Sequence, residues 1–117
     1  MTRARTTAHQ LTVPATIKMV TSAGFTQAEV GKVVGAAERT VQSWSAAQSS
    51  PTGVKRDRLL DLQVIVTLLS DVYTNDGIEI WLHSRNRNLD LRRPIDLLIE
   101  SRFDEVVEEA MALAKAM

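Results

Sequence analysis

The sequence contains no cysteine, which excludes disulfide bonds, thiolate-ligated zinc and a cysteine nucleophile together. Aromatic residues are also scarce, at 4% of the 117 positions, so a core has to form mainly from aliphatic side chains. No apolar run approaches the roughly 18 residues of a membrane span. The opening MTRARTTAHQ has no apolar segment after its arginines and does not read as a signal peptide. We therefore expect a soluble, cytoplasmic protein without a membrane partner.

Catalytic and metal-binding motifs are absent as well. The chain has no GxSxG elbow, phosphate-binding loop or HExxH pair. Its two histidines are isolated, His9 in an expected N-terminal tail and His83 close to Trp81. We expect no enzymatic activity, no cofactor and no metal. The hydrophobic content of 44% is nevertheless high enough to build a folded core.

The charged residues balance overall but are divided unevenly along the chain. Residues 1–58 carry eight basic and three acidic side chains, a net charge of +5. Residues 59–117 carry six basic and eleven acidic side chains, a net charge of −5. A basic half joined to an acidic half indicates two partners of opposite character. Chance variation on a solvated surface is the alternative.

Apolar residues recur near every 3.6 positions in each periodic segment, which predicts an all-helical fold. We expect helices at about 13–23, 26–35, 37–47 and 54–74, one capped by Asn75-Asp76-Gly77, one opened by Pro94 and one capped by Ser101. The breaker SSPTG is expected to mark a subdomain boundary. The expected parts are a flexible tail at 1–12, a helix-turn-helix subdomain at 13–50, and a long helix with a C-terminal domain at 54–117.

The long helix carries an apolar arc that is wider than a single packing face requires. One stripe consists of Leu59, Leu62, Val66, Leu69 and Tyr73, and the arc is widened by Leu60, Val64, Ile65, Leu68 and Val72. We expect one side to pack within the fold and the other against a second copy, giving a homodimer. Burial wholly within its own chain is the alternative.

Residues 26–47, TQAEVGKVVGAAERTVQSWSAA, contain two short helical segments around a glycine, as in a helix-turn-helix. Thr26 and Glu29 have the spacing of a capping box, and Phe25 and Val30 that of a hydrophobic staple. The small Gly31 is expected to let the second helix approach closely. Val30, Val34, Val41 and Trp44 are expected to fix the angle between the helices, with Trp44 as the main anchor.

The second of these helices has the side chains of a DNA-recognition helix. Arg39, Thr40, Gln42 and Ser43 are expected to project outward, where Arg pairs with guanine and Gln with adenine. Gln27 begins the first helix and is placed for a phosphate. Ala37 lacks the side chain of a helix cap, and Glu38 brings a negative charge near phosphates, so we expect one copy to bind operator DNA modestly. A plain helical hairpin is the alternative.

The helix-turn-helix segment resembles the Xre (Cro/repressor-like) class, whose members read T-Q-x-E-[LV]-[AG] with a Trp at the end of the recognition helix. A second string, WLHSRNRNLDLRRPIDLL, resembles the C-terminal domain of the Xre/MbcA/ParS antitoxin family, W-L-x-x-P-N-x-x-L-x-G-x-x-P-[LI]-D-L-L. The matching positions are Trp81, Leu82, Asn86, Leu89, Pro94, Ile95, Asp96, Leu97 and Leu98. The resemblance covers about residues 15–115.

Three departures from the family pattern stand out. Arg85 replaces a proline, Leu91 a glycine, and Arg102-Phe103 the usual Gly-Ala. The glycine change matters most, because leucine tolerates a positive φ poorly. We therefore expect the turn before Pro94 to differ in shape.

The resemblance implies an antitoxin of a type II toxin–antitoxin pair. Such a protein neutralises a RES-domain, NAD-degrading toxin by covering its active site, and it represses its own operon. We expect a hetero-oligomer in which toxin contacts come from an arginine-rich loop and an acidic terminal helix: Arg85, Asn86, Arg87, Arg92, Arg93, Glu105, Glu108, Glu109 and the Met117 carboxylate. Trp81, Leu82, Pro94 and Asp96 are expected to be structural anchors of this module.

Other interpretations of the same residues are open. The chain could be a stand-alone Xre-like transcriptional regulator without a toxin partner. It could also be an interaction module whose helix-turn-helix no longer binds DNA, as Ala37 and Glu38 would allow. The acidic face of the terminal helix could simply be solvated.

Overall fold

The computed structural model describes residues 11–116, and this part of the chain is all-helical, as predicted. The helices, in chain order, are α2 (Val13–Ser22), α3 (Gln27–Val34), α4 (Glu38–Ser45), α5 (Gly53–Ser70), α6 (Asn75–His83), the 3₁₀ turn η1 (Arg87–Leu89), α7 (Pro94–Ile99) and α8 (Phe103–Lys115). Between residues 11 and 116 there is no strand, and β pairing is limited to one isolated bridge between Asn86 and Arg92. None of the described helices is both long and apolar enough to cross a membrane.

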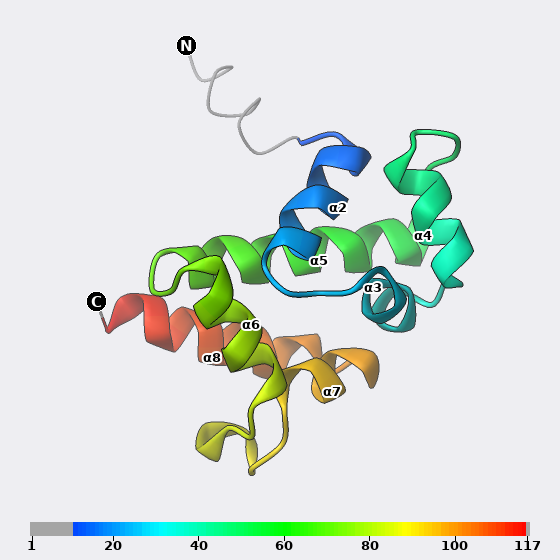
Figure 1. The fold of residues 1–117 in the computed structure, drawn as a ribbon. Coiled ribbons are helices and arrows are strands. Elements are labelled where there is room, and N and C mark those ends of the chain that lie inside the picture. The colour runs from blue at the N-terminus through cyan, green and yellow to red at the C-terminus, as the bar shows by residue number, and fades with distance from the viewer. Residues whose placement is uncertain (1–10, 117) are drawn as a thin grey trace.

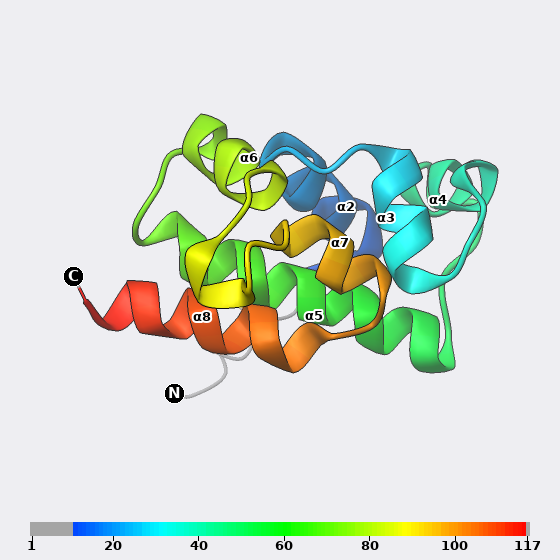
Figure 2. The ribbon, with the colours of Figure 1, turned by 90° about the horizontal axis from the view of Figure 1, so that it is seen from below.

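The long helix α5 forms the centre of the molecule (Figures 1 and 2). Helices α2 and α3 pack on α5, and α4 packs on α2 and α3, so the N-terminal helices form a cluster at one end of the molecule. Helix α8 lies along another side of α5, with α7 and η1 packed against α8. Because α3 also contacts α7, the N-terminal cluster and the C-terminal helices touch each other directly as well as through α5.

A single aliphatic core runs through all of these helices. Its members extend from Ile17 on α2 to Ala110 on α8, and they include Leu62, Ile65 and Leu69 on the inner face of α5. The buried aromatic side chains of this core are Phe25 and Trp44. The core therefore continues on both sides of the 49–53 breaker.

The predicted start of α3 is confirmed. The Thr26 hydroxyl accepts the Glu29 amide at 3.0 Å, and the Glu29 carboxylate accepts the Thr26 amide at 3.0 Å, which completes the capping box. Phe25 and Val30 are both buried, as a hydrophobic staple requires. Gly31 was expected to let the second helix approach closely. The close approach is instead to the turn before that helix, because a Cβ at Gly31 would lie 2.4 Å from the Ala36 carbonyl oxygen.

Two predicted boundaries are wrong. Helix α5 ends at Ser70, short of the expected 74, and Thr74 caps α6 by accepting the Gly77 amide at 3.2 Å, so Asn75 to Gly77 form the first turn of α6. Ser101 does not cap α8. It has a φ of 66°, and its amide and that of Arg102 donate to the carbonyls of Leu98 and Leu97. Ser101 thus closes α7 in a Schellman motif.

Candidate functional site

The exposed face of α4 gathers most of the residues predicted to bind DNA. Val41 and Trp44 are buried beneath the helix, while Arg39, Thr40 and Gln42 are exposed and Ser43 is half-buried. These four outward residues line one open hollow together with the start of the following loop. The Ser43 and Ser49 hydroxyls are 2.8 Å apart, which ties this loop to the helix.

The two weaknesses foreseen for this surface are present. Ala37 occupies the N-cap position of α4 and provides no side-chain hydrogen bond. Glu38 is exposed in the first turn of the same helix. Gln27 is the first residue of α3 and is half-buried, so its exposed part lies at the positive end of that helix.

A second surface is built by the loop between α6 and α7. Asn86 organises it: its side-chain oxygen accepts the Asn88 amide at 2.8 Å, and its backbone pairs with Arg92 and Leu91. Leu82 and Pro94 are buried at the two ends of the loop, and Trp81 is half-buried. The loop is therefore held by its own backbone hydrogen bonds between two buried anchors.

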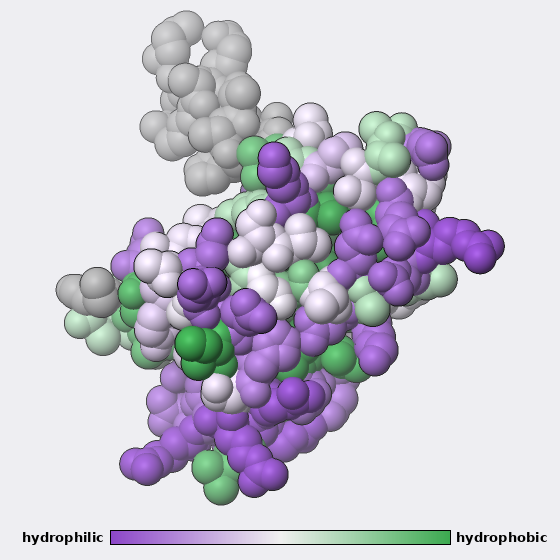
Figure 3. All heavy atoms as spheres, in the orientation of Figure 1, coloured by the Kyte–Doolittle hydropathy of each residue, from purple (hydrophilic) through white to green (hydrophobic). Residues whose placement is uncertain are grey.

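Leu91, at the position where the family pattern has glycine, lies near the tip of this loop. It has a φ of 63° and is 61% exposed. The leucine thus adopts the left-handed conformation, which costs about 1–2 kcal/mol for a residue with a Cβ. On the face shown in Figure 3, small apolar areas interrupt a mostly polar surface, one over α6 and one where this loop turns at the bottom.

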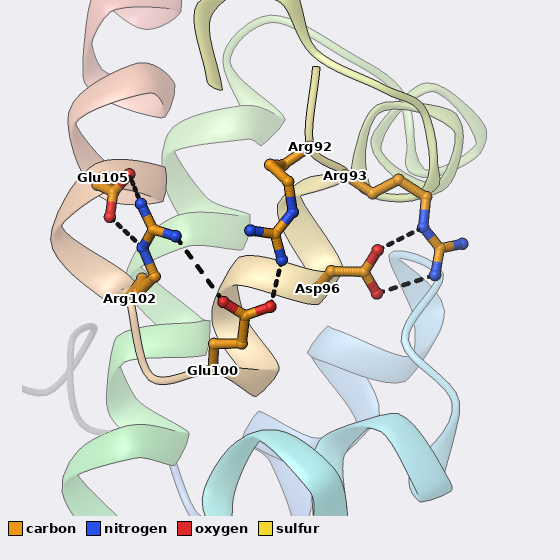
Figure 4. Close-up of polar contacts among 6 residues, drawn as sticks. All are labelled: Arg92, Arg93, Asp96, Glu100, Arg102 and Glu105. Carbon is orange, nitrogen blue, oxygen red and sulfur yellow. Dashed lines mark hydrogen bonds and ion pairs between the residues drawn. The ribbon is translucent and has the colours of Figure 1, made fainter. Parts of the chain in front are cut away.

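Several of the charged residues predicted to contact a toxin are engaged within the chain (Figure 4). Arg93 forms two hydrogen bonds to Asp96, of 2.8 and 2.9 Å, which lower the pKa of that carboxyl group. Arg92 pairs with Glu100. Arg102 pairs with Glu105 at 2.8 Å and with Glu100 at 3.8 Å.

These ion pairs leave a smaller set of groups available to a partner. Glu109 accepts a hydrogen bond from the Asn88 amide group at 2.9 Å. Arg85 and Arg87, by contrast, are exposed and have no ion-pair partner among residues 11–116. Glu108 is also exposed, and Met117 lies outside the described residues.

Sequence reasoning missed a hollow of about 550 Å³ between α6, the start of the loop and α8. It brings together Ile80, Trp81, Arg85, Asn86, Arg87 and Leu113. Ile80 is 66% exposed, although it belongs to an otherwise amphipathic helix whose Ile78 and Leu82 are buried. An isoleucine out of phase with the buried face was the signal available in the sequence.

His83 was expected to be an isolated histidine, but it joins α6 to α3. Its Nε2 lies 2.9 Å from Oε2 of Glu29, and its Nδ1 lies 2.8 Å from the Glu79 carbonyl oxygen. Partial burial lowers the pKa of His83, but the hydrogen bonds to the Glu79 carbonyl and to Glu29 outweigh it, so the pKa is raised. The C-terminal end of α6 is therefore tied to the capping box of the helix-turn-helix.

No model of a protein family matches the chain. A probable mycobacterial cidal antitoxin of Mycobacterium tuberculosis is 41% identical over 83 residues, covering 71% of this chain and 70% of the relative. The mycobacterial cidal antitoxin MbcA of Mycobacterium bovis is 33% identical over 94 residues, covering 80% of this chain and 83% of the relative.

Among solved structures, a chain of the M. tuberculosis MbcT–MbcA toxin–antitoxin complex superposes with a TM-score of 0.76. It is 29% identical, and the match covers 92% of this chain and 98% of the other. The predicted resemblance of the chain to MbcA-type antitoxins is thereby confirmed. The chain belongs to the family of mycobacterial cidal antitoxins of the MbcA type.

Proposed function

We propose that this protein is the antitoxin of a type II pair and that its C-terminal helices α6 to α8 bind and silence a RES-domain toxin that degrades NAD. The observation that carries the proposal is the likeness to a chain of a toxin–antitoxin complex, which extends over nearly the whole molecule. The protein then acts by occupying a surface of its partner, without chemistry of its own.

For the mechanism, we propose that the C-terminal end of α8 lies across the mouth of the toxin's NAD pocket. By analogy with ADP-ribosyl-transferring enzymes, that pocket is lined by basic groups that hold a pyrophosphate. The net charge of −5 on residues 59–117 and the exposed Glu108 favour such an approach. Glu105 and Glu109 are less available, because Arg102 and Asn88 already hold them.

We also propose that the protein represses its own operon through α4, as a dimer and as a complex with the toxin. The exposed Arg39 and Gln42 support base contacts in the major groove. Leu60 and Val64 on α5 are 37% and 48% exposed and line an apolar groove with Leu68, which supports packing against a second copy. Two helix-turn-helix units would then meet half-sites about one helical turn apart.

The decisive experiment is co-expression with the product of the neighbouring gene, which this proposal expects to be a RES-domain toxin, followed by affinity purification and measurement of cellular NAD. We expect the two proteins to purify together and NAD to return to the level of cells without toxin. A chain that binds its promoter but neither binds the toxin nor restores NAD would be a stand-alone regulator. A chain that binds the toxin but not the promoter would be an interaction module alone.

A further inference from the structure

The hollow between α6, residues 84–87 and α8 is lined by both apolar and cationic side chains. Its apolar lining consists of Ile80, Trp81 and Leu113, together with the ring of Tyr73. Ile80 is the most exposed large hydrophobic residue of the described chain, at 66%. A single exposed isoleucine is ordinary on a protein surface, but one that lines a hollow beside a tryptophan offers a contact for another apolar side chain.

Arg85 and Arg87 form the cationic lining of the same hollow. They differ from Arg92, Arg93 and Arg102, whose guanidinium groups are each matched by a carboxylate of this chain. Glu109 also lines the hollow, but its carboxylate already accepts a hydrogen bond from the side-chain amide of Asn88. The charged residues that line the hollow are thus two arginines and one glutamate, so the hollow has a local positive charge although residues 59–117 are acidic overall.

We infer that this hollow receives a segment of the toxin that carries an apolar side chain next to one or more carboxylates; this rests on the antitoxin role proposed above. A carboxylate can pair bidentately with an arginine that has no competing partner, whereas at Arg92 or Arg93 it would first have to displace Glu100 or Asp96.

Two variants test the apolar and the cationic parts separately. Ile80→Arg places a charge in the apolar lining, and Arg85→Glu with Arg87→Glu reverses the charge of the cationic lining. Matched controls are Val54→Arg, at an aliphatic side chain that is 61% exposed outside the hollow, and Lys55→Glu with Arg56→Glu, which makes the same change in net charge. The full-length proteins are titrated against the purified RES-domain toxin, and circular dichroism melting checks that each variant is folded.

We expect each hollow variant to weaken toxin binding by at least about tenfold, the loss typical of a central interface contact, and each control to stay within about twofold of the wild type. The arginine variant should in addition flatten the salt dependence of binding. If the wild type binds the toxin and the hollow variants bind it equally well, the hollow is not the docking site, although the antitoxin role stands. If the wild type itself does not bind, the proposed function fails first.

Discussion

At the scale of single residues, His83 connects two elements that lie 54 positions apart in the chain. Its ring bridges the Glu79 carbonyl of its own helix and the Glu29 carboxylate of α3. Arg93 and Asp96 are the other charged groups close enough to influence it, and Arg93 opposes its protonation. Since Glu29 also completes the capping box, one carboxylate serves both the start of α3 and its contact with α6.

The raised pKa of His83 predicts a pH-dependent contribution to stability. A group whose pKa is higher in the folded than in the unfolded state stabilises the fold fully below the unfolded value of about 6.5, and this stabilisation is lost as pH rises through the folded pKa. We expect His83→Gln to lower the free energy of unfolding by about 0.2–1 kcal/mol more at pH 5.5 than at pH 8.5, the range of a partly exposed ion pair. Urea unfolding at both pH values measures this.

Glu29→Gln is the partner control for that experiment. It removes the charge that faces His83 while keeping a side chain that can complete the capping box. The double variant should lose no more pH-dependent stability than either single variant. A destabilisation by His83→Gln of equal size at both pH values would show that the ring contributes by packing alone.

At the scale of one element, α4 is a short helix with little intrinsic support. It has no side-chain cap, and it is held mainly by Val41 and Trp44, which are buried against α2 and α3. Its exposed face contributes little to that packing. Changes on this face should therefore alter the proposed contacts with DNA without disturbing the fold.

We expect Arg39→Ala with Gln42→Ala to abolish the operator shift in gel electrophoresis and to leave toxin binding unchanged. Each lost bidentate contact to a base costs about 1–3 kcal/mol, and both side chains are exposed in the free protein. Lys55→Ala with Arg56→Ala serves as a control, since it removes positive charge from exposed sites on α5. Operator binding that survives the first double substitution would mean that α4 is not the recognition helix.

At the scale of the whole molecule, the two proposed binding surfaces share one core. Helix α8 contributes Val106 and Ala110 to it and packs along α5, which also carries the N-terminal helices. Removing residues 103–117 would therefore open the core as well as delete the proposed toxin contact. A shorter deletion, confined to residues 114–117, leaves both buried side chains in place.

We expect the chain shortened by residues 114–117 to bind the toxin but to restore at most about a tenth of the NAD that the full chain restores. Binding and neutralisation separate because the hollow on α6 is retained while the end that would cover the NAD pocket is lost. Measuring the affinity for the toxin tests the retained binding, and quantifying NAD with the same pair of proteins tests the lost neutralisation. Full restoration of NAD by the shortened chain would place the blocking contact elsewhere on the antitoxin.

The sequence predicted the features that depend on neighbours within one helical turn. The capping box of Thr26 and Glu29, the missing cap at Ala37 and the buried stripe of α5 all follow from such short-range patterns. The Trp81–Leu98 string is longer than one turn, but it is contiguous in the chain and could therefore suggest the antitoxin family from the sequence. The wrong prediction for the start of α6 was also a local one. The cap was expected at Asn75–Gly77, and the actual cap is the preceding residue, Thr74.

Only the tertiary structure decided which charged side chains lack an ion-pair partner within the described chain and which helices contact one another. Arg92, Arg85 and Arg87 look alike in the sequence, yet the fold pairs Arg92 with Glu100, eight positions away, and leaves the other two exposed. The pairing of His83 with Glu29 likewise depends on how α6 docks on α3. The physical reason is that helix formation is governed by hydrogen bonds between near neighbours, whereas ion pairing across the molecule depends on how the shared core orients whole helices.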